Sequence, residues 1–546
     1  MVRALIVGIW LILLCGPVSA AWTPIVGIPE PSFGINEVAP AVPDPWTADT
    51  TGFYYVAAGG TNSGNGYPAN PRGTIPSGVP AGSVIELHGA LSFANATKTF
   101  TGTAESPIFL RGAAESTLSI KMEVSATSAY LIIENLNMTP TTNGSGLVIL
   151  GGSHHIAVRN SDIAGLSGST ITYGGIAIGG YVNTVSADNI VIDNVYVHDR
   201  GIIELTASGN PDMHCITLGG ATSSVWITNS ELTRCSGDGV QINAGAGNND
   251  KIHHIYIGNN EIHGNRQAGA HSKQASHVIM SSNNVYDHYM WSTDSAGQGL
   301  GMQYGPDYVW FINNLIHDNE VGIYLGSNSE GAGTEVFAVG NSIYNNGPHH
   351  LLPTNYGGIY IGGGVNRYIV NNTLSGYDNG VNCQTQIGSV RVIGNIFNSK
   401  ATDAAYELLF DYYDPESPLI VEIKNNIFHN EFSTPRFKWM SDVYTSVATL
   451  EATSTEFSGN AYVSPLFVDA SNDNYRIQTT SPAKDTGILS DVYATFQALY
   501  GIDISKDIDG TVRPQNSLWD IGAYEFVPPP SYYPFMSASG QVYKRP

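Results

Sequence analysis

A short pattern of apolar and polar positions recurs along most of the chain. In its usual form the pattern has eight positions: apolar residues at positions 1, 3 and 8, Asn at position 5, and variable residues elsewhere. The pattern occurs eleven times, at residues 131–138, 156–163, 190–197, 225–232, 255–262, 278–285, 309–316, 336–343, 368–374, 390–397 and 421–428. Alternation with a period of two residues is typical of a β-strand with one buried face, so each copy predicts a strand.

The distance between copies limits how these strands can be connected. Successive fifth positions lie 23 to 35 residues apart, which leaves no room for a crossover helix between consecutive parallel strands in every repeat. A repeat of this length is typical of stacked coils, in which each coil pairs its backbone groups with the next. The pattern therefore predicts a parallel β-helix.

Two polar columns accompany the pattern. The fifth position, usually Asn, fits a bend of the coil. The next position is Asn in seven of the copies, at Asn260, Asn283, Asn314, Asn341, Asn372, Asn395 and Asn426. Amides stacked from coil to coil can form a hydrogen-bonded ladder, and we interpret both columns as structural.

Each coil also carries a second strand, which usually opens with Gly. These strands occur at 214–220, 238–245, 268–274, 298–305, 321–327, 357–363 and 379–385, and we align Cys215 with Gly239, Gly269, Gly299, Gly322, Gly358 and Gly380. One inward column then contains Ile216, Val240, Ala270, Leu300, Ile323, Ile359 and Val381. The alternate residues must point outwards.

The outward residues form a candidate functional patch within about three coils of Lys273. Its members are His214, Asp238, Gln241, Asn243, His271, Lys273, Gln298, Gln303 and Tyr324. Gly301, Gly326 and Gly362 are expected to leave room for a chain to lie along this face. A register shift of one residue would turn the whole set inwards.

Composition narrows the class of partner. The 546-residue chain has 61 Gly and a net charge of −23, from 23 Lys and Arg against 46 Asp and Glu. This charge argues against nucleic acid, since a phosphate backbone requires a basic face. It also disfavours a polyanionic glycan unless local cations intervene.

The first twenty residues indicate export. "MVRALIVGIWLILLCGPVSA" has one early cation, an apolar run and a small-x-small ending, so we predict a signal peptide cleaved after Ala20. The protein is then secreted, to the medium, the periplasm or the cell surface. Three cysteines remain, of which Cys215 and Cys235 could pair. No other segment has the roughly 20 apolar residues of a membrane span.

The chain divides into five expected segments. They are a signal peptide at 1–20, a Pro-rich lead at 21–50, a β-helix with its N-terminal cap at 51–430, C-terminal coils with a capping segment at 431–526, and a Pro-rich tail at 527–546. The text "DIDGTVRPQNSLWDIGAYEF" is similar to the terminal segment of secreted bacterial right-handed parallel β-helix proteins. This resemblance implies an all-β, right-handed, single-stranded solenoid of about eleven or more coils with terminal caps.

A second resemblance concerns chemistry. "SGDGVQI", followed about thirty residues later by the Lys-bearing strand "AGAHSKQ", resembles the pectate-lyase-like families, notably the family 9 polysaccharide lyases. The resemblance implies Lys273 as the base that removes the proton next to a uronate carboxylate. It also implies Ca²⁺ held by Asp residues, for which the matching positions are Asp238, Asp212 and His214. Gln241 stands where the family pattern has another Asp, which leaves a set poor in carboxylates for Ca²⁺.

Our leading hypothesis is therefore a polysaccharide lyase that cleaves a uronate-containing glycan by β-elimination, acts on an acidic polysaccharide and is a monomer. The catalytic candidates are Lys273, His271 and Tyr324, and the substrate-binding candidates are Arg266, Gln241, Asn243, Gln298, Gln303 and Tyr304. One alternative is a non-catalytic surface or matrix protein that binds glycan or protein along its groove. Another is a polygalacturonase-type hydrolase, which requires more clustered carboxylates.

Overall fold

The computed structural model describes residues 31–92, 96–139, 146–165, 174–179, 185–203, 212–245, 251–289, 297–326, 335–347, 357–383, 387–399, 406–411 and 420–528. The expected signal peptide, the first part of the Pro-rich lead and nearly all of the Pro-rich tail lie outside these residues. Among the residues described, no helix is both long and apolar enough to cross a bilayer.

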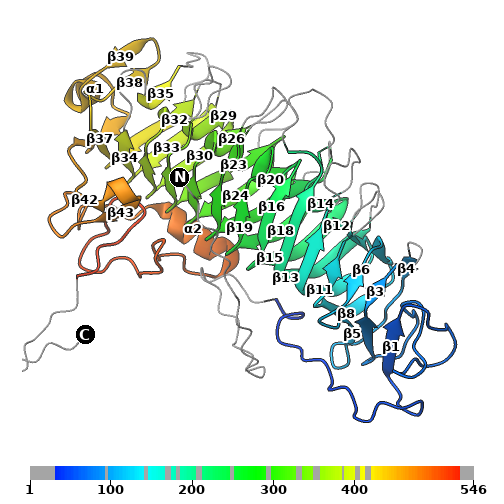
Figure 1. Ribbon diagram of the computed structural model, residues 1–546. Helices are drawn as coiled ribbons and strands as arrows, with labels where there is room; N and C mark the ends of the chain where they lie inside the picture. The colour runs from blue at the N-terminus through cyan, green and yellow to red at the C-terminus, as the bar shows by residue number, and fades with distance from the viewer. Residues whose placement is uncertain are drawn as a thin grey trace, which may run out of the picture.

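Parallel strands stack coil upon coil into an elongated solenoid with three faces (Figure 1). The first face consists of β1 (Phe53–Ala57), β2 (Val84–His88), β5 (Ile108–Gly112), β8 (Ala129–Glu134), β11 (His154–Ala164), β13 (Ser186–Arg200), β15 (Ala221–Thr228), β18 (His253–Gly258), β21 (Ser276–Ser281), β24 (Asp307–Ile312), β27 (Glu335–Val339), β30 (Gly364–Val370), β33 (Ile387–Ile393), β36 (Ile420–Lys424) and β40 (Phe457–Ser458).

The second face is made by shorter strands, and β11 and β13 run on into it. Its own strands are β3 (Ala90–Leu91), β6 (Thr117–Leu118), β9 (Asn137–Met138), β16 (Glu231–Cys235), β19 (Glu261–His263), β22 (Asn284–Tyr286), β25 (Leu315–His317), β28 (Ser342–Tyr344), β31 (Thr373–Ser375), β34 (Ile396–Ser399), β37 (Ile427–Asn430) and β41 (Ala461–Tyr462). Most copies of the sequence pattern are therefore two strands, one on each of these faces, rather than a single strand.

The third face contains the second strand predicted for each coil. Its strands are β4 (Ala96–Lys98), β7 (Met122–Val124), β10 (Leu147–Leu150), β12 (Ile176–Gly179), β14 (Ile216–Gly219), β17 (Val240–Asn243), β20 (Ala268–Lys273), β23 (Gln298–Gln303), β26 (Val321–Gly326), β29 (Gly357–Gly362), β32 (Asn379–Cys383), β35 (Tyr406–Phe410), β38 (Phe437–Trp439) and the antiparallel β39 (Asp442–Tyr444). The predicted parallel β-helix is confirmed.

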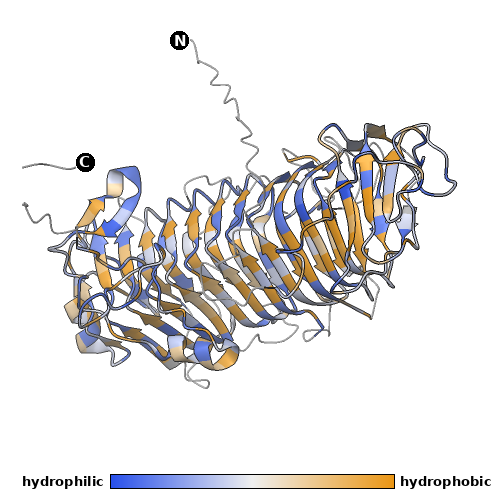
Figure 2. Ribbon diagram, turned by 90° about the horizontal axis from the view of Figure 1, so that it is seen from below, coloured by the Kyte–Doolittle hydropathy of each residue, from blue (hydrophilic) through white to orange (hydrophobic). Residues whose placement is uncertain are grey.

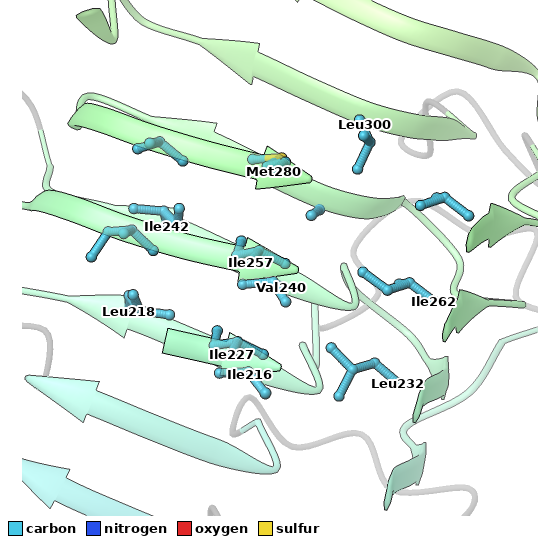
Figure 3. Close-up of a cluster of buried hydrophobic side chains, with 14 of the residues drawn as sticks. Ile216, Leu218, Ile227, Leu232, Val240, Ile242, Ile257, Ile262, Met280 and Leu300 are labelled. Atoms are coloured by element: carbon cyan, nitrogen blue, oxygen red, sulfur yellow. The ribbon is translucent and has the colours of Figure 1, made fainter. Parts of the chain in front are cut away.

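The core runs along the axis of the solenoid. Each coil contributes aliphatic side chains from all three faces, as Ile216, Ile227 and Leu232 show for one coil (Figure 3). All three side chains are fully buried, and each such burial contributes about 1.5–3 kcal/mol. Apolar and polar residues alternate along the strands (Figure 2), because successive side chains point to opposite sides of a strand.

The bend between the first two faces depends on Asn. Asn259 has a left-handed backbone with φ of 57°, a conformation that Asn adopts more readily than most residues. The next residue, Asn260, is buried, and its Nδ2 donates to Ile227 O at 2.9 Å and to Asn283 Oδ1 at 3.0 Å. The same contacts repeat along Asn260, Asn283, Asn314, Asn341, Asn372, Asn395, Asn426 and Asn460. The predicted ladder is thus confirmed.

The terminal segments cover parts of the first two faces. Residues 31–50 pack Phe33 on the first face, where the Arg159 guanidinium donates to Gly34 O and Glu37 O. At the other end, α1 (Val447–Thr453) closes the core with Leu450. The helix α2 (Asp491–Tyr500) lies along the first face, with Phe496 edge-on to Trp310 at 4.8 Å (Figure 1).

The rest of the C-terminal segment contains the short antiparallel pair β42 (Phe467–Asp469) and β43 (Asn474–Ile477), joined by a 3-10 turn at Ala470–Asn472. Tyr475 from this pair packs against Tyr344 of the second face. Closer to the core, Cys215 and Cys235 form a disulfide with a Cα separation of 5.6 Å. The pairing that the sequence left open is thereby decided.

Candidate functional site

The third face has the register predicted from the Gly-opened strands. Gln241 pairs with His271 and Asn243 pairs with Lys273 between β17 and β20. In the next coil Lys273 pairs with Gln303 and His271 with Gly301. We call Asn243, Lys273 and Gln303 the Lys273 row. The neighbouring His271 row contains Thr217, Gln241, His271, Gly301, Tyr324 and Tyr360.

The two rows differ in exposure. Asn243, Lys273 and Gln303 are all half-buried, so the Lys273 row is within reach of solvent. In the His271 row, by contrast, Gln241 is 5% exposed and His271 only 6%. Polar groups on the outward side of the sheet are thus arranged in two layers, with Lys273 in the accessible one.

Asp238 lies two residues before β17 and belongs to the buried layer. Its Oδ2 accepts a hydrogen bond of 3.0 Å from Gln241 Nε2, while its Oδ1 has no partner among the described residues. Burial raises the pKa of the Asp238 carboxyl to about 6, although the positive charge of Lys273 partly opposes this shift. The charges of Lys273 and Arg266 and the hydrogen bond from Gln241 favour the ionised form of this carboxyl against the effect of burial.

His214 is held in its neutral form beside this carboxylate. Its Nδ1 accepts a hydrogen bond of 2.8 Å from Asp238 N–H, and therefore carries no proton. Burial lowers the pKa of His214 to about 3. The 3.5 Å distance between His214 Nδ1 and Asp238 Oδ2 is consequently not an ion pair at neutral pH.

His271, one of the catalytic candidates, is also neutral. Burial, and secondarily the charge of Lys273, lower the pKa of His271 well below its usual value. His271 therefore adds no positive charge beside Lys273, because a buried imidazole next to an ammonium group loses its proton first. Its Nε2 has no hydrogen-bond partner among the described residues, and neither has Oε1 of the 3%-exposed Gln298.

Arg266 places a second positive charge near His214 and Asp238. The guanidinium is almost fully buried; its Nε donates to Ser236 O at 2.6 Å and its Nη2 to Asp212 Oδ1 at 2.5 Å. Gln267 Nε2 donates to the same Asp212 oxygen at 2.6 Å. Arg266 is therefore paired with Asp212 rather than directed at the open face.

The three residues matched to a calcium site do not fit that ion. Calcium prefers six to eight oxygen ligands including several carboxylates. Here one Asp212 oxygen is bonded to Arg266 and Gln267, Asp238 is the remaining carboxylate, and His214 offers a nitrogen that already accepts a hydrogen bond. No group of three His, Cys, Asp or Glu within the described chain is placed to hold a metal ion.

Tyr324 lies farther along the His271 row, two strands beyond β20. Its ring stacks on Tyr360 with centroids 5.3 Å apart and an angle of 11°. The ring covers Gly326, and its hydroxyl lies beside Gly362 of β29. The structure therefore does not bring the Tyr324 hydroxyl to Lys273, and the pair forms an aromatic platform instead.

The glycines of this face have a different use from the one expected. A Cβ at Gly326 would collide with the Tyr324 ring, and a Cβ at Gly301 would lie 2.5 Å from Gln298 Oε1. These positions accommodate side chains of the protein itself rather than leaving an open track. The role of Gly301 in making room for the buried Gln298 side chain was not predicted from the sequence. The signal in the sequence was a Gly between His271 and Tyr324 in the same row.

The other predicted substrate-binding residues lie at the edge of the face. Asn243 Oδ1 accepts a hydrogen bond of 3.0 Å from Gly245 N–H, which leaves the Asn243 amide nitrogen for a ligand. Tyr304 follows Gln303 with a left-handed backbone, φ 61°, and is half-buried. Both residues adjoin the Lys273 row.

The three-faced stack defines the class of the molecule. Residues 247–404 match the family model described as a right-handed β-helix region, and the chain is a right-handed parallel β-helix protein with terminal caps, as predicted. No functionally curated protein matches it in sequence.

Several solved structures are similar to the chain at low identity. Pectate lyase Pel9A is 13% identical, with 88% of this chain and 98% of that one covered and a TM-score of 0.41. A variant of the PL6-family alginate lyase AlyGC is also 13% identical, covering 76% and 56% with a TM-score of 0.44. PfbA, a surface adhesin of Streptococcus pneumoniae, is 11% identical, covering 67% and 87% with a TM-score of 0.39.

Proposed function

We propose that the protein is a secreted polysaccharide lyase that cleaves a uronate-containing glycan by β-elimination, with Lys273 as the base. One observation carries the proposal: Lys273 is the single charged residue on the described strands β12 to β32 of the third face. It is half-buried, between the amides Asn243 and Gln303 and close to the buried, neutral His271. Its amine is the basic group that these strands place within reach of a bound glycan, and a base must lie within reach of the proton it removes.

The reaction needs one proton transfer and one bond cleavage. In its unprotonated form, the Lys273 amine removes the proton from the sugar carbon next to the carboxylate. The electron pair of that C–H bond forms a carbon–carbon double bond while the bond to the glycosidic oxygen breaks. The leaving oxygen takes up a proton from water, and the protonated amine returns its own proton to solvent.

The buried layer would act as a positioning layer in this reaction. His271 and Gln298 lie on the same strands as Lys273 and Gln303, and their side chains are buried. Polar groups fixed in advance contribute more to catalysis than groups that must reorganise. Tyr324 and Tyr360 are suited to stack on a sugar ring two or three coils from Lys273.

The decisive experiment compares two substitutions of Lys273. Lys273→Ala removes charge and base, whereas Lys273→Arg keeps the charge on a group that stays protonated. On a panel of uronate-containing glycans, followed by the ultraviolet absorbance of the unsaturated product, both variants are expected to lose roughly a hundred- to ten-thousand-fold in kcat.

The control for this experiment is Lys438→Ala. Lys438 belongs to β38 on the same face and pairs with Asp411 at 2.6 Å. This variant is expected to retain wild-type activity. Unsaturated product formed at the wild-type rate by Lys273→Arg would refute Lys273 as the base.

A non-catalytic glycan-binding protein is the second candidate, because the Tyr324 and Tyr360 platform would serve binding without chemistry. It predicts retained binding of oligosaccharides and no product from any glycan. A polygalacturonase-type hydrolase is less well supported, because it requires at least two clustered carboxylates. Asp212 is bonded to Arg266, which leaves Asp238 as the carboxylate of the buried layer.

A further inference from the structure

We infer that the substrate is a heteropolysaccharide in which isolated uronates are separated by uncharged sugars, rather than a polyuronate. This inference rests on the proposed function and names the substrate class of the same site. It follows from the distribution of charge along the solenoid on the two sides of Lys273.

Beyond Lys273 the chain offers no cation for several coils. Residues 274–366 contain no Lys or Arg but seven acidic residues, namely Asp287, Asp294, Asp307, Asp318, Glu320, Glu330 and Glu335. This stretch builds every strand from β21 to β29, including β23, β26 and β29 of the third face. The next cation, Arg367, is buried and donates to Gly363 O at 2.7 Å.

Before Lys273 the nearby cations are engaged elsewhere. Arg266 is buried against Asp212. Arg234 belongs to β16 of the second face and binds Asp199 with an N–O distance of 2.5 Å. Lys251 is exposed two residues before β18, at the entrance to the first face. Lys273 is thus the sole cation that the described strands β12 to β32 of the third face present to a ligand.

A polyuronate would meet an unfavourable field on this surface. One sugar is about as long as one coil spacing, which is about 4.8 Å. A polyuronate chain extending from Lys273 to Tyr360, three strands away, would therefore place a carboxylate over every coil. Each would lie on a protein of net charge −23 without a cation to offset it. Like charges at such distances repel, and desolvation in a groove strengthens the effect.

Uncharged sugars match the same surface well. The residues available beyond Lys273 are the Gln303 amide and the stacked rings of Tyr324 and Tyr360. Amides bind sugar hydroxyls, and aromatic rings pack against the apolar side of a pyranose. One uronate at Lys273 followed by uncharged sugars on the Gln303 amide and the two Tyr rings matches the charge and the polarity of these three contacts.

The test measures kcat/KM on two kinds of glycan. Pectate and alginate represent polyuronates, and gellan, whose repeat has one glucuronate among uncharged hexoses, represents the heteropolymer. All are assayed with and without added calcium, since a dissolved divalent cation could bridge carboxylates to the protein. We expect at least tenfold higher kcat/KM on the heteropolymer in both conditions. Equal or faster cleavage of pectate or alginate in either condition would overturn the inference while leaving the proposed lyase activity standing.

Two variants sharpen the test. Gln303→Lys adds a cation one coil beyond Lys273 and is expected to raise kcat/KM on pectate about fivefold, the size expected for one exposed ion pair. The matched control is Gln497→Lys on the exposed side of α2, which adds the same charge on the first face and should leave the preference unchanged.

Tyr324→Ala tests the uncharged-sugar site. It is expected to raise KM on the heteropolymer several-fold while kcat changes little, because a stacked sugar is lost and the base is not. An unchanged KM would contradict the inference. Absence of product from every glycan would overturn the proposed function and this inference with it.

Discussion

At the residue scale, a buried histidine outside the candidate site links the stability of the fold to pH. His288 stands in a column where neighbouring coils carry Asn265, Asn319 and Asn346. Its Nδ1–H donates to Asn319 Oδ1 at 2.8 Å, and its Nε2 accepts from Asn265 Nδ2 at 3.3 Å. The bond accepted by Nε2 requires the neutral ring, and burial lowers the pKa of His288 to about 3.

This histidine predicts a specific acid sensitivity. The folded-state pKa lies below the unfolded value of about 6.5, so the stability due to the neutral ring is complete above that pH and is lost as the pH falls toward 3. The loss amounts to about 1.4 kcal/mol per pH unit for each such group. His288→Asn is expected to show a smaller drop in the free energy of unfolding between pH 6.5 and 4.5, measured by urea denaturation. An identical drop in variant and wild type would contradict the assignment.

At the element scale, the bend and ladder determine how the coils stack. Asn314 lies in the middle of the ladder, where Asn283 N–H and Nδ2 both donate to its Oδ1 at 3.0 Å. Its own Nδ2 donates to Met280 O and Asn341 Oδ1, both at 2.9 Å. Removing this side chain leaves several buried groups unsatisfied at once.

Asn314→Ala is therefore expected to lower the free energy of unfolding by about 2–4 kcal/mol, since each buried group left unsatisfied costs about 1–3 kcal/mol and local relaxation recovers part. Asn460→Ala, at the half-exposed end of the ladder, serves as the matched control and should cost less. Thermal or urea unfolding of both variants measures the two losses in free energy of unfolding. Equal losses would mean that burial of the ladder contributes little.

The sequence predicted these elements well because they depend on local rules. Period-two alternation predicted the strands, the Asn at the bend reflects a left-handed backbone, and the Gly column gave the correct register around Lys273. The division of most copies into two strands was missed, because a bend at a left-handed residue does not interrupt the apolar pattern.

Other features of the site depend on contacts between distant segments. The bond between Arg266 and Asp212 spans 54 residues, and it withdraws one carboxylate from the expected metal set. The neutral state of His271 and the direction of the Tyr324 ring depend on packing between coils. None of these follows from spacing along the chain.

At the scale of the whole molecule, the faces have separate tasks. The contacts described for the terminal segments lie on the first and second faces, as with Phe496 on Trp310 and Tyr475 on Tyr344. The third face carries the Lys273 row and the aromatic platform. Lys273 is the single charged residue on the described strands β12 to β32 of this face, in a protein of net charge −23, and from this combination we infer a preference for sparsely charged glycans.

The most direct test of the central claim is the mass of the products formed from a defined uronate-containing oligosaccharide. By mass spectrometry, β-elimination predicts two fragments whose masses add up to that of the substrate, one of them bearing an unsaturated end, and both absent with Lys273→Arg. Fragments that together exceed the substrate by one water would show hydrolysis and would contradict the account.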